Sequence, residues 1–527
     1  MLACFRFWLF STAFILCLYP LSAQQAPLTE MRGCWIVTLN NIDWPSKPGL
    51  PPERQRMEFD SLLDALKATG INAVFVQIRP AGDAFYPTPS APWSRFLTGQ
   101  EGIPPLPEYD PVEYMVQAAH KRNMEFHAWM NPFRATPSLD TASLAASHPM
   151  KMLPEHRVRE WFFPYGTRYY FNPGSPFVKQ YIVGLVREVV TRYDVDGIHF
   201  DDYFYPYKEQ GWELNDFDAF AADPRGFQYI DDWRRDNINR IVEAISKEIR
   251  QLKPYVQFGI SPFGVWRNRD KDPNGSETNA GMTSYDDLYA DVRLWLEKGW
   301  IDYVTPQLYW SIGFPAADYY KLSDWWGRNS FGRKVYTGHA AYKVGSSAVG
   351  DAAWNDPAQI RNQVQINRAV PGVQGSIYFS ANALLRNPLG VRDSLRNNLY
   401  ALPAVVPPAA GATMVAAATP RICRVKGEKN SVKLAWQVCN IASGGEMPYY
   451  YTLHRFPGSG VGDINDRRYA LHITEYNDNT WIFEDKDVAP KEIYTYVLVA
   501  YNRANMPGYP SEPVVVKKTK KSAKRKK

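Results

Sequence analysis

Between about residue 30 and residue 402, short apolar runs alternate with longer amphipathic stretches, and the two kinds of segment follow one another in strict succession. The short runs are rich in Val, Ile, Phe and Tyr, and they have the length of buried β-strands. On this pattern we expect strands over residues 33–39, 73–79, 125–130, 197–201, 257–261, 303–308, 334–338 and 375–379.

The stretches between these runs repeat apolar residues at helical spacing, and several begin at residues that favour a helix start. They predict helices that begin near Pro52, Asp110, Ser175, Tyr229, Tyr285, Ala316, Asp356 and Asn387. Alternating strands and helices indicate a parallel sheet. Eight successive units predict that the sheet closes into a (β/α)8 TIM barrel over residues 30–402, whose active site would lie where the strands end.

Beyond the barrel the pattern changes twice. Residues 403–419 are rich in Ala, Pro and Val without periodicity, which predicts a linker. Alternating runs at 431–436, 449–456, 481–485 and 494–501 then predict a small all-β sandwich over residues 420–516. Trp436 and Tyr494 resemble the core Trp and the tyrosine corner of a fibronectin type III domain, which implies that fold. A spacer or packing role is the favoured interpretation over binding.

The two ends of the chain are read as a targeting signal and a tail. Residues 1–23 predict a signal peptide, since Arg6 precedes an apolar run too short to span a bilayer and small residues precede Gln24. We therefore expect export to the periplasm or the cell surface. Residues 517–527 hold eight Lys and Arg, and removing these charges from the net charge of +6 leaves −2. This balance does not support nucleic-acid binding. It predicts a disordered basic tail that contacts anionic envelope polymers.

Cysteine usage and motifs indicate neither a metal nor a cofactor. After removal of the signal, Cys34, Cys423 and Cys439 remain. Cys423 and Cys439 share the C-terminal module, where a disulfide and two separate thiols are both open. The chain has no Cys-x-x-Cys, no zinc-ligand spacing, no glycine-rich phosphate loop and no Gly-x-Ser-x-Gly. We expect chemistry carried by side chains alone.

The fourth predicted strand ends in the most informative stretch of the chain, residues 196–206. Side chains alternate along a strand, so His199 and Asp201 share the face that points into the barrel mouth, and Asp202 opens the following loop. Two adjacent acids beside apolar walls must shift at least one pKa. Glycoside hydrolysis needs one protonated and one ionised carboxyl. We predict Asp201 as nucleophile or base, and Asp202 or Asp83 as acid, over an alternative in which these acids cap a loop or bind Arg.

The stretch also resembles two glycosidase patterns. Asp-Gly-x-x-x-Asp at strand four is similar to amylase-like barrels, which implies a nucleophile at Asp201. Asp-Gly-x-Asp-x-Asp-x-Glu is the chitinase pattern, from which this chain departs at His199 and Tyr203. The departure at Tyr203 removes the chitinase general acid. The second catalytic carboxyl is therefore either Asp202 or Asp83, and Asp43 and Glu277 are the next candidates.

Other strand ends carry groups suited to sugar binding. A guanidinium binds a carboxylate bidentately, so Arg79 and Arg134 can orient the acids or bind an acidic substituent. Trp266 and Trp310 can stack on sugar rings. The predicted substrate-binding residues, which together indicate a sugar cleft, are Arg79, His127, Asn131, Arg134, His199, Tyr203, Ser261, Trp266, Gln307, Tyr309, Trp310 and His339.

Several segments together resemble the glycosyl hydrolase-like family ten domain. They are residues 31–35, 76–84, 127–132, 261–268 and the strand-four stretch, and the resemblance covers the chain from about residue 30 to 400. It implies an exported bacterial glycosidase of the cell envelope, where members cleave peptidoglycan glycan strands stripped of peptides. We expect hydrolysis of an N-acetylated envelope polysaccharide. The alternatives are a non-catalytic carbohydrate-binding protein and a hydrolase of another glycan.

Overall fold

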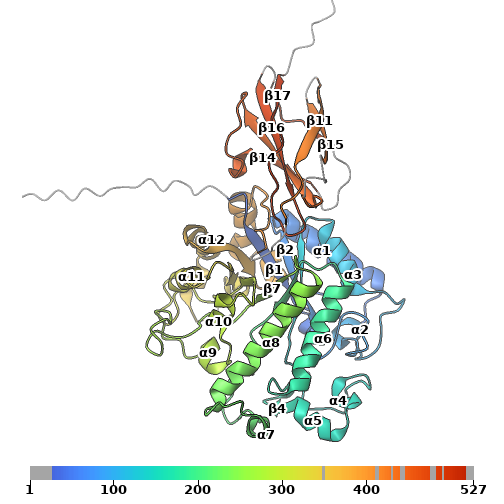
Figure 1. Ribbon diagram of the computed structural model, residues 1–527, viewed down its shortest axis with the longest axis vertical. Coiled ribbons are helices and arrows are strands. Elements are labelled where there is room, and N and C mark those ends of the chain that lie inside the picture. Colours follow the sequence, from blue (N-terminus) through green and yellow to red (C-terminus); the bar gives the residue numbers. More distant parts are fainter. Residues whose placement is uncertain are drawn as a thin grey trace, which may run out of the picture.

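The computed structural model describes residues 27–346, 350–409, 415–428, 431–438, 445–474, 482–489 and 492–517. The expected signal peptide, Cys439 and all but the first residue of the basic tail lie outside these residues. Cys423 is exposed on β11 (Pro420–Gly427). Figure 1 shows two units, a barrel surrounded by helices and an all-β unit at one end of it.

The barrel is closed and entirely parallel, which confirms the predicted architecture. Each strand pairs with its neighbour in chain order, and the last strand returns to the first, with Met31 opposite Gly375. The strands are β1 (Met31–Ile36), β2 (Ala73–Arg79), β3 (Glu125–Met130), β6 (Gly197–Phe200), β7 (Gln257–Ile260), β8 (Tyr303–Val304), β9 (Lys334–His339) and β10 (Val373–Tyr378).

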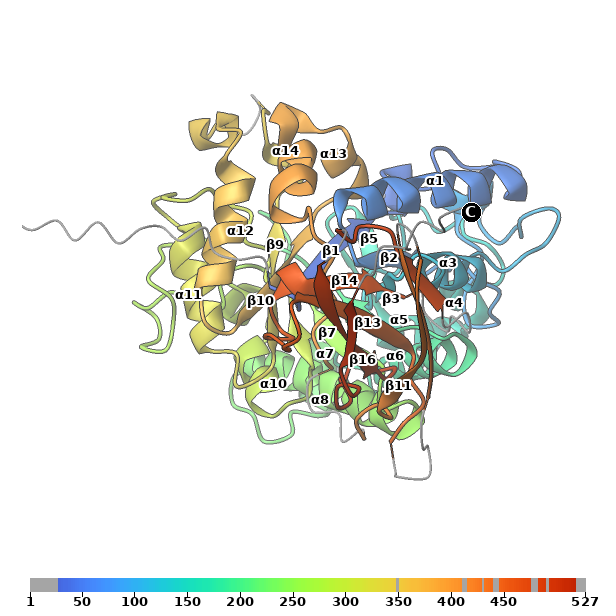
Figure 2. The ribbon, with the colours of Figure 1, turned by 90° about the horizontal axis from the view of Figure 1, so that it is seen from above.

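The covering helices form a ring around the barrel in Figure 2. The Asp110 carboxylate accepts from the backbone N of Val112 at 3.1 Å, which caps α3 as the sequence predicts. Among the described residues no helix is long and apolar enough to cross a membrane. The covering helices are α1 (Pro52–Thr69), α3 (Pro111–His120), α6 (Pro176–Arg192), α8 (Ile230–Leu252), α10 (Val292–Glu297), α11 (Tyr319–Arg328), α12 (Gln359–Ala369), α13 (Ala381–Leu385) and α14 (Val391–Ser394).

The loops where the strands end carry additional short elements. They lie in Figure 1 at the end of the barrel remote from the all-β unit. The two short strands pair antiparallel as a hairpin. These elements are α2 (Arg95–Thr98), α4 (Pro149–Met152), α5 (Glu155–Trp161), β4 (Phe162–Tyr165), β5 (Arg168–Phe171), α7 (Phe217–Ala222) and α9 (Ser284–Asp287).

Strand β8 is shorter than expected, because six residues were predicted and only Tyr303 and Val304 pair in the ladder. Pro306 has no N–H to donate, so the ladder is interrupted there. Gln307 forms isolated β-bridges to Gly338 of β9 and to Phe263, which follows β7. The chain therefore still reaches the mouth of the barrel beside its neighbours.

The fifth helix also differs from the prediction. The residue near which it was expected, Tyr285, lies in the four-residue α9, and the covering helix α10 begins only after Asp291. The Asp291 carboxylate accepts from the backbone N of Leu294 at 3.3 Å and caps α10. The left-handed backbone of Tyr289, with φ of 54°, separates the two helices.

Glycines inside the barrel make room for the large rings that fill it. A Cβ on Gly197 would lie 2.3 Å from Nδ1 of His127, and a Cβ on Gly259 would lie 2.0 Å from the Tyr303 ring. Real Cβ contacts are never this short. The interior is therefore packed by facing each large ring with a residue that has no side chain.

We expect Gly259→Ala to destabilise the protein by about 1–3 kcal/mol, because the added methyl group would overlap the Tyr303 ring. Urea unfolding followed by circular dichroism measures the change. Gly184→Ala in α6 is the control, because a Cβ at this position would meet nothing within 4 Å. The substitution also removes the flexibility of a glycine inside a helix, so it should not destabilise the protein. Equal stability of the two variants would contradict the prediction.

The all-β unit consists of two antiparallel sheets. One contains β11, β12 (Val432–Val438) and β15 (Ile482–Asp485), and the other contains β14 (Ala470–Ile473), β13 (Tyr450–Pro457), β16 (Ile493–Tyr501) and β17 (Val514–Lys517). Trp436 is buried in the core between them. The Tyr494 hydroxyl accepts from the backbone N of Ala489 at 3.1 Å. Strands β11, β14 and β17 were not predicted from the sequence.

The first part of the predicted linker is packed against the barrel. The backbone N of Val405 donates to Leu28 O, and Val405 O accepts from Glu30 N, both at 2.9 Å. Val406 is buried among the interior side chains Met31 and Tyr336. These apolar residues, which show no periodicity in the sequence, therefore pack against the end of the barrel where the strands begin and do not form an unattached linker.

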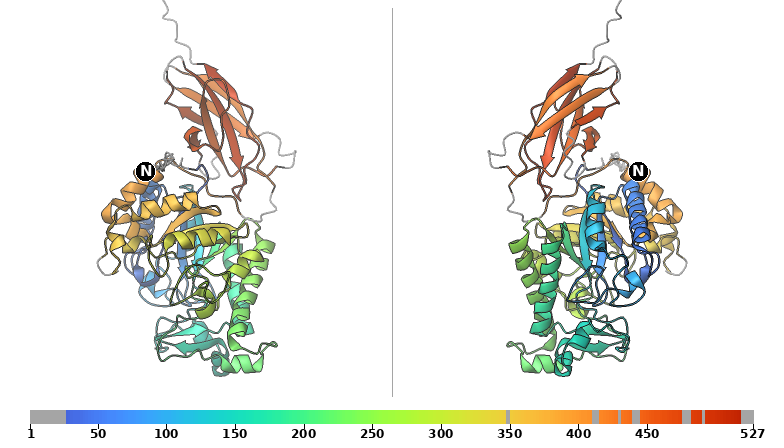
Figure 3. Two further views of the ribbon diagram at one scale, coloured as in Figure 1. Left: turned by 90° about the vertical axis from the view of Figure 1, so that its left-hand side faces the viewer. Right: turned by 90° about the vertical axis from the view of Figure 1, so that its right-hand side faces the viewer.

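The all-β unit covers the end of the barrel where the strands begin (Figure 3). Arg503, in the loop after β16, forms an ion pair with Asp196, which precedes β6, and lies 3.3 Å from Asp194. Its guanidinium lies between the rings of Tyr255 and Tyr449, at 5.1 and 4.6 Å from their centroids. The mouth at the opposite end is left uncovered by this unit.

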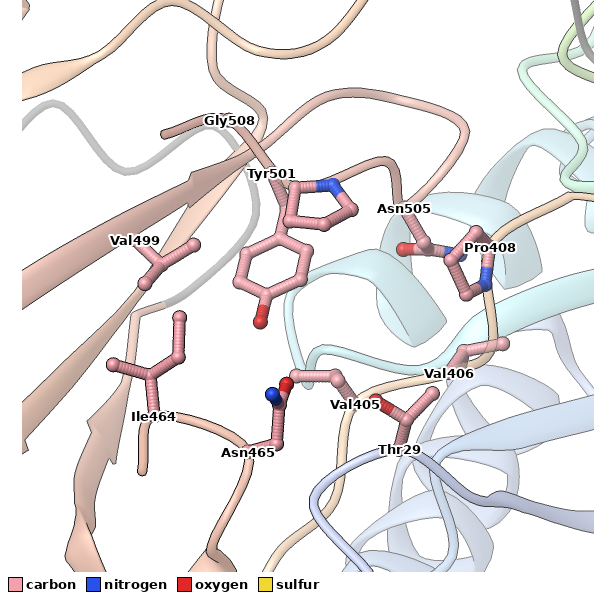
Figure 4. A pocket seen from close by; sticks show the side chains of 11 residues that line it. Thr29, Val405, Val406, Pro408, Ile464, Asn465, Val499, Tyr501, Asn505 and Gly508 are labelled. Carbon is pink, nitrogen blue, oxygen red and sulfur yellow. The ribbon is translucent and has the colours of Figure 1, made fainter. Parts of the chain in front are cut away.

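A cavity of about 140 Å³ lies between the two units. Figure 4 shows the Tyr501 side chain pointing into it. The Asn505 side chain at its edge also donates to Oε1 of Glu125, the first residue of β3, at 2.6 Å. The all-β unit therefore contacts the interior of the barrel directly. The cavity lining includes Thr29, Val405, Ile464, Val499, Tyr501 and Asn505.

Candidate active site

Asp201 follows β6 directly and is buried at the mouth of the barrel. Its Oδ2 accepts from Trp129 Nε1 at 3.2 Å and from Asn131 Nδ2 at 3.1 Å, whereas Oδ1 is buried without a hydrogen-bond partner. Burial, and then the negative charge of Asp202, raises the pKa of Asp201 to about 7. Below this pH Asp201 is a neutral acid, and the backbone N–H of Tyr203 together with Trp129 opposes the rise of its pKa.

Asp202 has a different set of partners. Its carboxylate accepts from the Tyr207 hydroxyl and from the Gln307 amide. Burial raises the pKa of Asp202, and these donors oppose the rise because they favour the ionised form. The two adjacent carboxyl groups are therefore placed to hold different protonation states at the same pH.

Arg134 adds a positive charge to this mouth. Its guanidinium lies 4.5 Å from the Tyr203 ring centroid, and its backbone N donates to Oδ1 of Asn131 at 3.0 Å. The positive charge opposes the upward pKa shifts of both Asp201 and Asp202. Asn131 thus joins Arg134 to the acid pair, because its amide nitrogen donates to Asp201.

A row of half-buried aromatic rings continues from the acid pair. Tyr203 and Tyr207 have ring centroids 5.4 Å apart, Tyr207 and Phe263 6.4 Å, and Phe263 and Trp310 5.5 Å. We call these four residues the aromatic arc. Burial raises the pKa of the Tyr309 hydroxyl well above its usual range, with Asp202 among the charges that add to it. Aromatic faces at the edge of a cleft suit stacking on sugar rings.

His199 lies beneath the mouth, inside the barrel. Its Nε2 accepts from Trp35 Nε1 at 3.2 Å, so the proton of a neutral ring is on Nδ1, which donates to the Tyr303 hydroxyl at 3.1 Å. The Ser261 hydroxyl is 3.1 Å from Nε2. Burial lowers the pKa of His199 well below its usual range. His199 and Ser261 are therefore buried beneath the mouth, where their hydrogen bonds hold the barrel interior together.

The same hydrogen-bonded column continues to the bottom of the barrel. The Tyr303 hydroxyl donates to His127 Nδ1 at 3.0 Å, and His127 Nε2 donates to Glu125 Oε2 at 2.9 Å. Asn505 of the all-β unit donates to the other oxygen of Glu125. His127 is therefore a member of the interior column, on the strand-begin side of His199.

Arg79 and Asp83 lie in a separate buried group on the β2 side. Arg79 donates from Nη2 to the Tyr181 hydroxyl of α6 at 3.3 Å. Asp83 accepts from the backbone N of Ala81 at 2.9 Å and from the Ser94 hydroxyl. None of their hydrogen bonds within the described ranges reaches the acid pair, so Asp83 organises its own loop.

Trp266 and His339 are also placed away from the mouth. Trp266 donates to Asp291 at 3.3 Å and stacks on Trp325 with a centroid distance of 5.8 Å. His339 points from β9 toward α12, where its Nδ1 lies 2.8 Å from Oε1 of Gln363. Both side chains are buried between the barrel and its covering elements.

The remaining two acids have structural partners. Asp43 accepts from the backbone N of Val37 at 2.8 Å and from the Ser380 hydroxyl at 2.9 Å, so it ties the end of β1 to the loop after β10. Glu277 is exposed and pairs with Arg269 at 2.5 Å. Within the described part of the chain, no group of three His, Cys, Asp or Glu residues is arranged to hold a metal ion.

Three mouth residues were missed by the sequence analysis: Trp129, Tyr207 and Phe263. Trp129 lies on β3 two residues before Asn131, which follows the strand, so strand alternation places both side chains on one side and could have identified Trp129. Tyr207 and Phe263 lie in loops, where no periodicity relates sequence position to direction. The contact of Tyr207 with Asp202, and that of Phe263 with Tyr207, come only from the fold of those loops.

A closed parallel barrel with a buried acid pair and an aromatic arc at its strand-end mouth has the architecture of the barrel glycosidases. The family described as Glycosyl hydrolase-like 10 matches residues 30–356, and the chain belongs to this family. The Bacillus subtilis (strain 168) protein Glycosyl hydrolase YngK is 42% identical over 490 residues, which are 92% of this chain and 93% of that relative.

Glycosyl hydrolase DigH of Escherichia coli (strain K12) is 38% identical over 383 residues, covering 69% of this chain and 86% of its own. The glycoside hydrolase domain of PgaB (BpsB) from Bordetella bronchiseptica is 14% identical, over 70% of this chain and 99% of that domain, with a TM-score of 0.44. The two relatives extend the family assignment over most of the chain.

Proposed function

We propose that the protein hydrolyses glycosidic bonds of a polysaccharide at the mouth of its barrel. The observation that carries the proposal is the acid pair, in which two adjacent buried carboxyls have unlike partners. Burial raises the pKa of Asp201 to about 7 and its Oδ1 has no hydrogen-bond partner, whereas Tyr207 and Gln307 donate to Asp202 and oppose the rise of its pKa. Glycoside hydrolysis requires one carboxyl of each kind.

These surroundings favour roles opposite to those expected from the sequence. Asp201 acts as the general acid, and the proton on its Oδ1 passes to the leaving glycosidic oxygen. Trp129 and Asn131 hold the other oxygen and so fix the direction of that proton. Asp202 is the ionised partner. It stabilises the positive charge that develops on the sugar and assists the attack of water on the sugar carbon of the cleaved bond.

The substrate that we propose is an N-acetylated polysaccharide of the cell envelope, such as peptidoglycan glycan strands stripped of peptides. Family membership and the aromatic arc support a polysaccharide. We further propose that the chain is exported by its first 23 residues and that the basic tail contacts anionic envelope polymer. The Trp436 core and the Tyr494 contact support a fibronectin type III-like fold for the all-β unit.

The experiment is incubation of the mature protein with peptide-free glycan strands, followed by measurement of new reducing ends and product masses. A panel of other bacterial and plant polysaccharides runs beside it. Release of defined oligosaccharides from the envelope glycan supports the proposal. Release from another polysaccharide reassigns the substrate. Tight binding without any product would instead make the protein a carbohydrate-binding protein.

The rate should fall as the pH rises through about 7, because Asp201 must carry a proton to act as the acid and its pKa is about 7. At low pH the rate should fall again as Asp202 becomes protonated. Initial rates of reducing-end release between pH 4 and pH 9 measure this profile. A rate that is constant from pH 6 to pH 9 would contradict the role of Asp201.

A further inference from the structure

Arg134 is a buried cation for which no counterion is in contact. It is 7% exposed, and within the described chain no carboxylate lies within 4.0 Å of its guanidinium. Its Nε is buried without a hydrogen-bond partner, and the Tyr203 hydroxyl accepts from the group. A guanidinium has five N–H donors, so most of its hydrogen-bonding capacity at this mouth is unused.

Two other buried arginines of the barrel have carboxylate partners, whereas Arg79 is, like Arg134, buried without one among the described residues. Arg234 pairs with Asp216 at 2.6 Å, and Arg368 pairs with Glu30 at 2.7 Å. A buried charge is costly unless a partner compensates it. Asp201 and Asp202 are near enough to feel the charge of Arg134 but are not in ion-pair contact. A bound ligand is therefore the best source of a counterion for the Arg134 guanidinium.

The position of the guanidinium limits what that partner can be. The guanidinium carbon lies over the Tyr203 ring and one N–H donates to the Tyr203 hydroxyl, so the remaining N–H groups are available to a ligand. Two parallel N–H groups of a guanidinium match the two oxygens of a carboxylate. Tyr203 follows Asp201 and Asp202 directly in the chain, so a carboxylate bound at this guanidinium would lie at the same mouth as the acid pair.

We infer that Arg134 is a specificity-determining residue that binds a carboxylate carried by a sugar of the substrate, next to the bond that is cleaved. The inference rests on the proposed glycosidase function and deepens it. The substrate class is an acidic glycan with free carboxylates, and neutral polysaccharides of the same backbone are poorer substrates. Tyr203 holds the guanidinium in the orientation that receives the carboxylate.

The test compares one glycan in two forms, with its sugar carboxylates free and with the same groups reduced to alcohols. The wild-type protein should cleave the carboxylate form with a kcat/KM about ten- to hundred-fold higher, the size of a charge-assisted hydrogen-bonded pair. Arg134→Gln should lose this preference by losing activity on the carboxylate form alone. Arg134→Lys, which keeps the charge without the planar edge, should retain only part of it.

Arg168→Gln is the matched control, because Arg168 lies on the neighbouring hairpin strand β5, where its guanidinium donates to the Thr167 hydroxyl at 3.5 Å and forms no ion pair among the described residues. It should keep the wild-type preference. Calorimetric binding of both glycans to Asp201→Asn, with and without Arg134→Gln, gives a second measure that needs no turnover. An equal loss on both glycan forms in Arg134→Gln, or equal binding of both forms before that change, would overturn the inference. Absence of cleavage with a preserved binding preference would overturn only the proposed function.

Discussion

Replacing Asp201 by Asn should reduce kcat for glycan hydrolysis by about 10²- to 10⁴-fold, because the amide cannot deliver a proton to the leaving oxygen. The amide oxygen can still accept from Trp129 and Asn131, so the mouth should keep its shape. Reducing-end release under saturating substrate measures kcat. The KM should change little, since the acid acts mainly on the transition state.

Asp302→Asn is the control for this prediction. Asp302 is another largely buried carboxyl, and burial raises its pKa to about 6. It lies at the beginning of β8, at the end of the barrel remote from the mouth, where it accepts from the backbone N of Phe258 at 2.8 Å. This variant should keep near wild-type kcat. If Asp201→Asn kept a tenth of the activity, or both variants lost it equally, Asp201 would not be the acid.

Replacing Arg503 by Met should lower the free energy of unfolding by about 3–5 kcal/mol, because it leaves the Asp196 carboxylate buried without its main counterion. Among the described residues, Asp196 would keep the backbone N of Phe126 and the His120 ring as hydrogen-bond partners. The same change loosens the contact between the all-β unit and the barrel. Urea unfolding at neutral pH measures the difference from wild type.

The pH dependence provides a check on the cause. Arg503 and His120 hold the pKa of Asp196 well below its usual range, so the stabilisation is present above the unfolded pKa of about 4 and is lost as the pH falls through the folded pKa. The difference between wild type and variant should therefore shrink at acidic pH. Arg468→Met, which breaks the pair of an exposed guanidinium with Asp466, should leave stability nearly unchanged. Losses of equal size would point to a general effect of losing Arg.

Much of the barrel could be predicted because its pattern is local. On β6, the apolar Ile198 and Phe200 mark the side that packs on helices, and this places His199 on the interior side and Asp201 at the mouth. On β3, by contrast, His127 was predicted to bind substrate but lies in the buried interior column, where it is hydrogen-bonded to Tyr303 and Glu125. Caps such as Asp110 and Ser175 also act over only a few residues, so their sequence signal was sufficient.

The errors occur where direction depends on distant parts of the chain. On β9, Gly338 faces the interior and His339 therefore points outward to Gln363, but the polarity of that strand does not distinguish its two sides. Trp266 follows a strand yet is covered by Trp325, a residue of α11. Asp83 is drawn into a buried group with Ser94, a contact formed by loop folding.

The sequence by itself determined the order of strands and helices, the closed parallel barrel and the placement of Asp201 and Asp202 at a strand end, because hydrophobic periodicity and capping are properties of neighbouring residues. Only the tertiary structure decided which acid has a pKa of about 7, that the Arg134 guanidinium has no carboxylate in contact among the described residues, and how Arg503 joins the two units. Those properties depend on burial and on partners far apart in the chain, since desolvation and pairing arise only when the folded chain excludes water from a particular group.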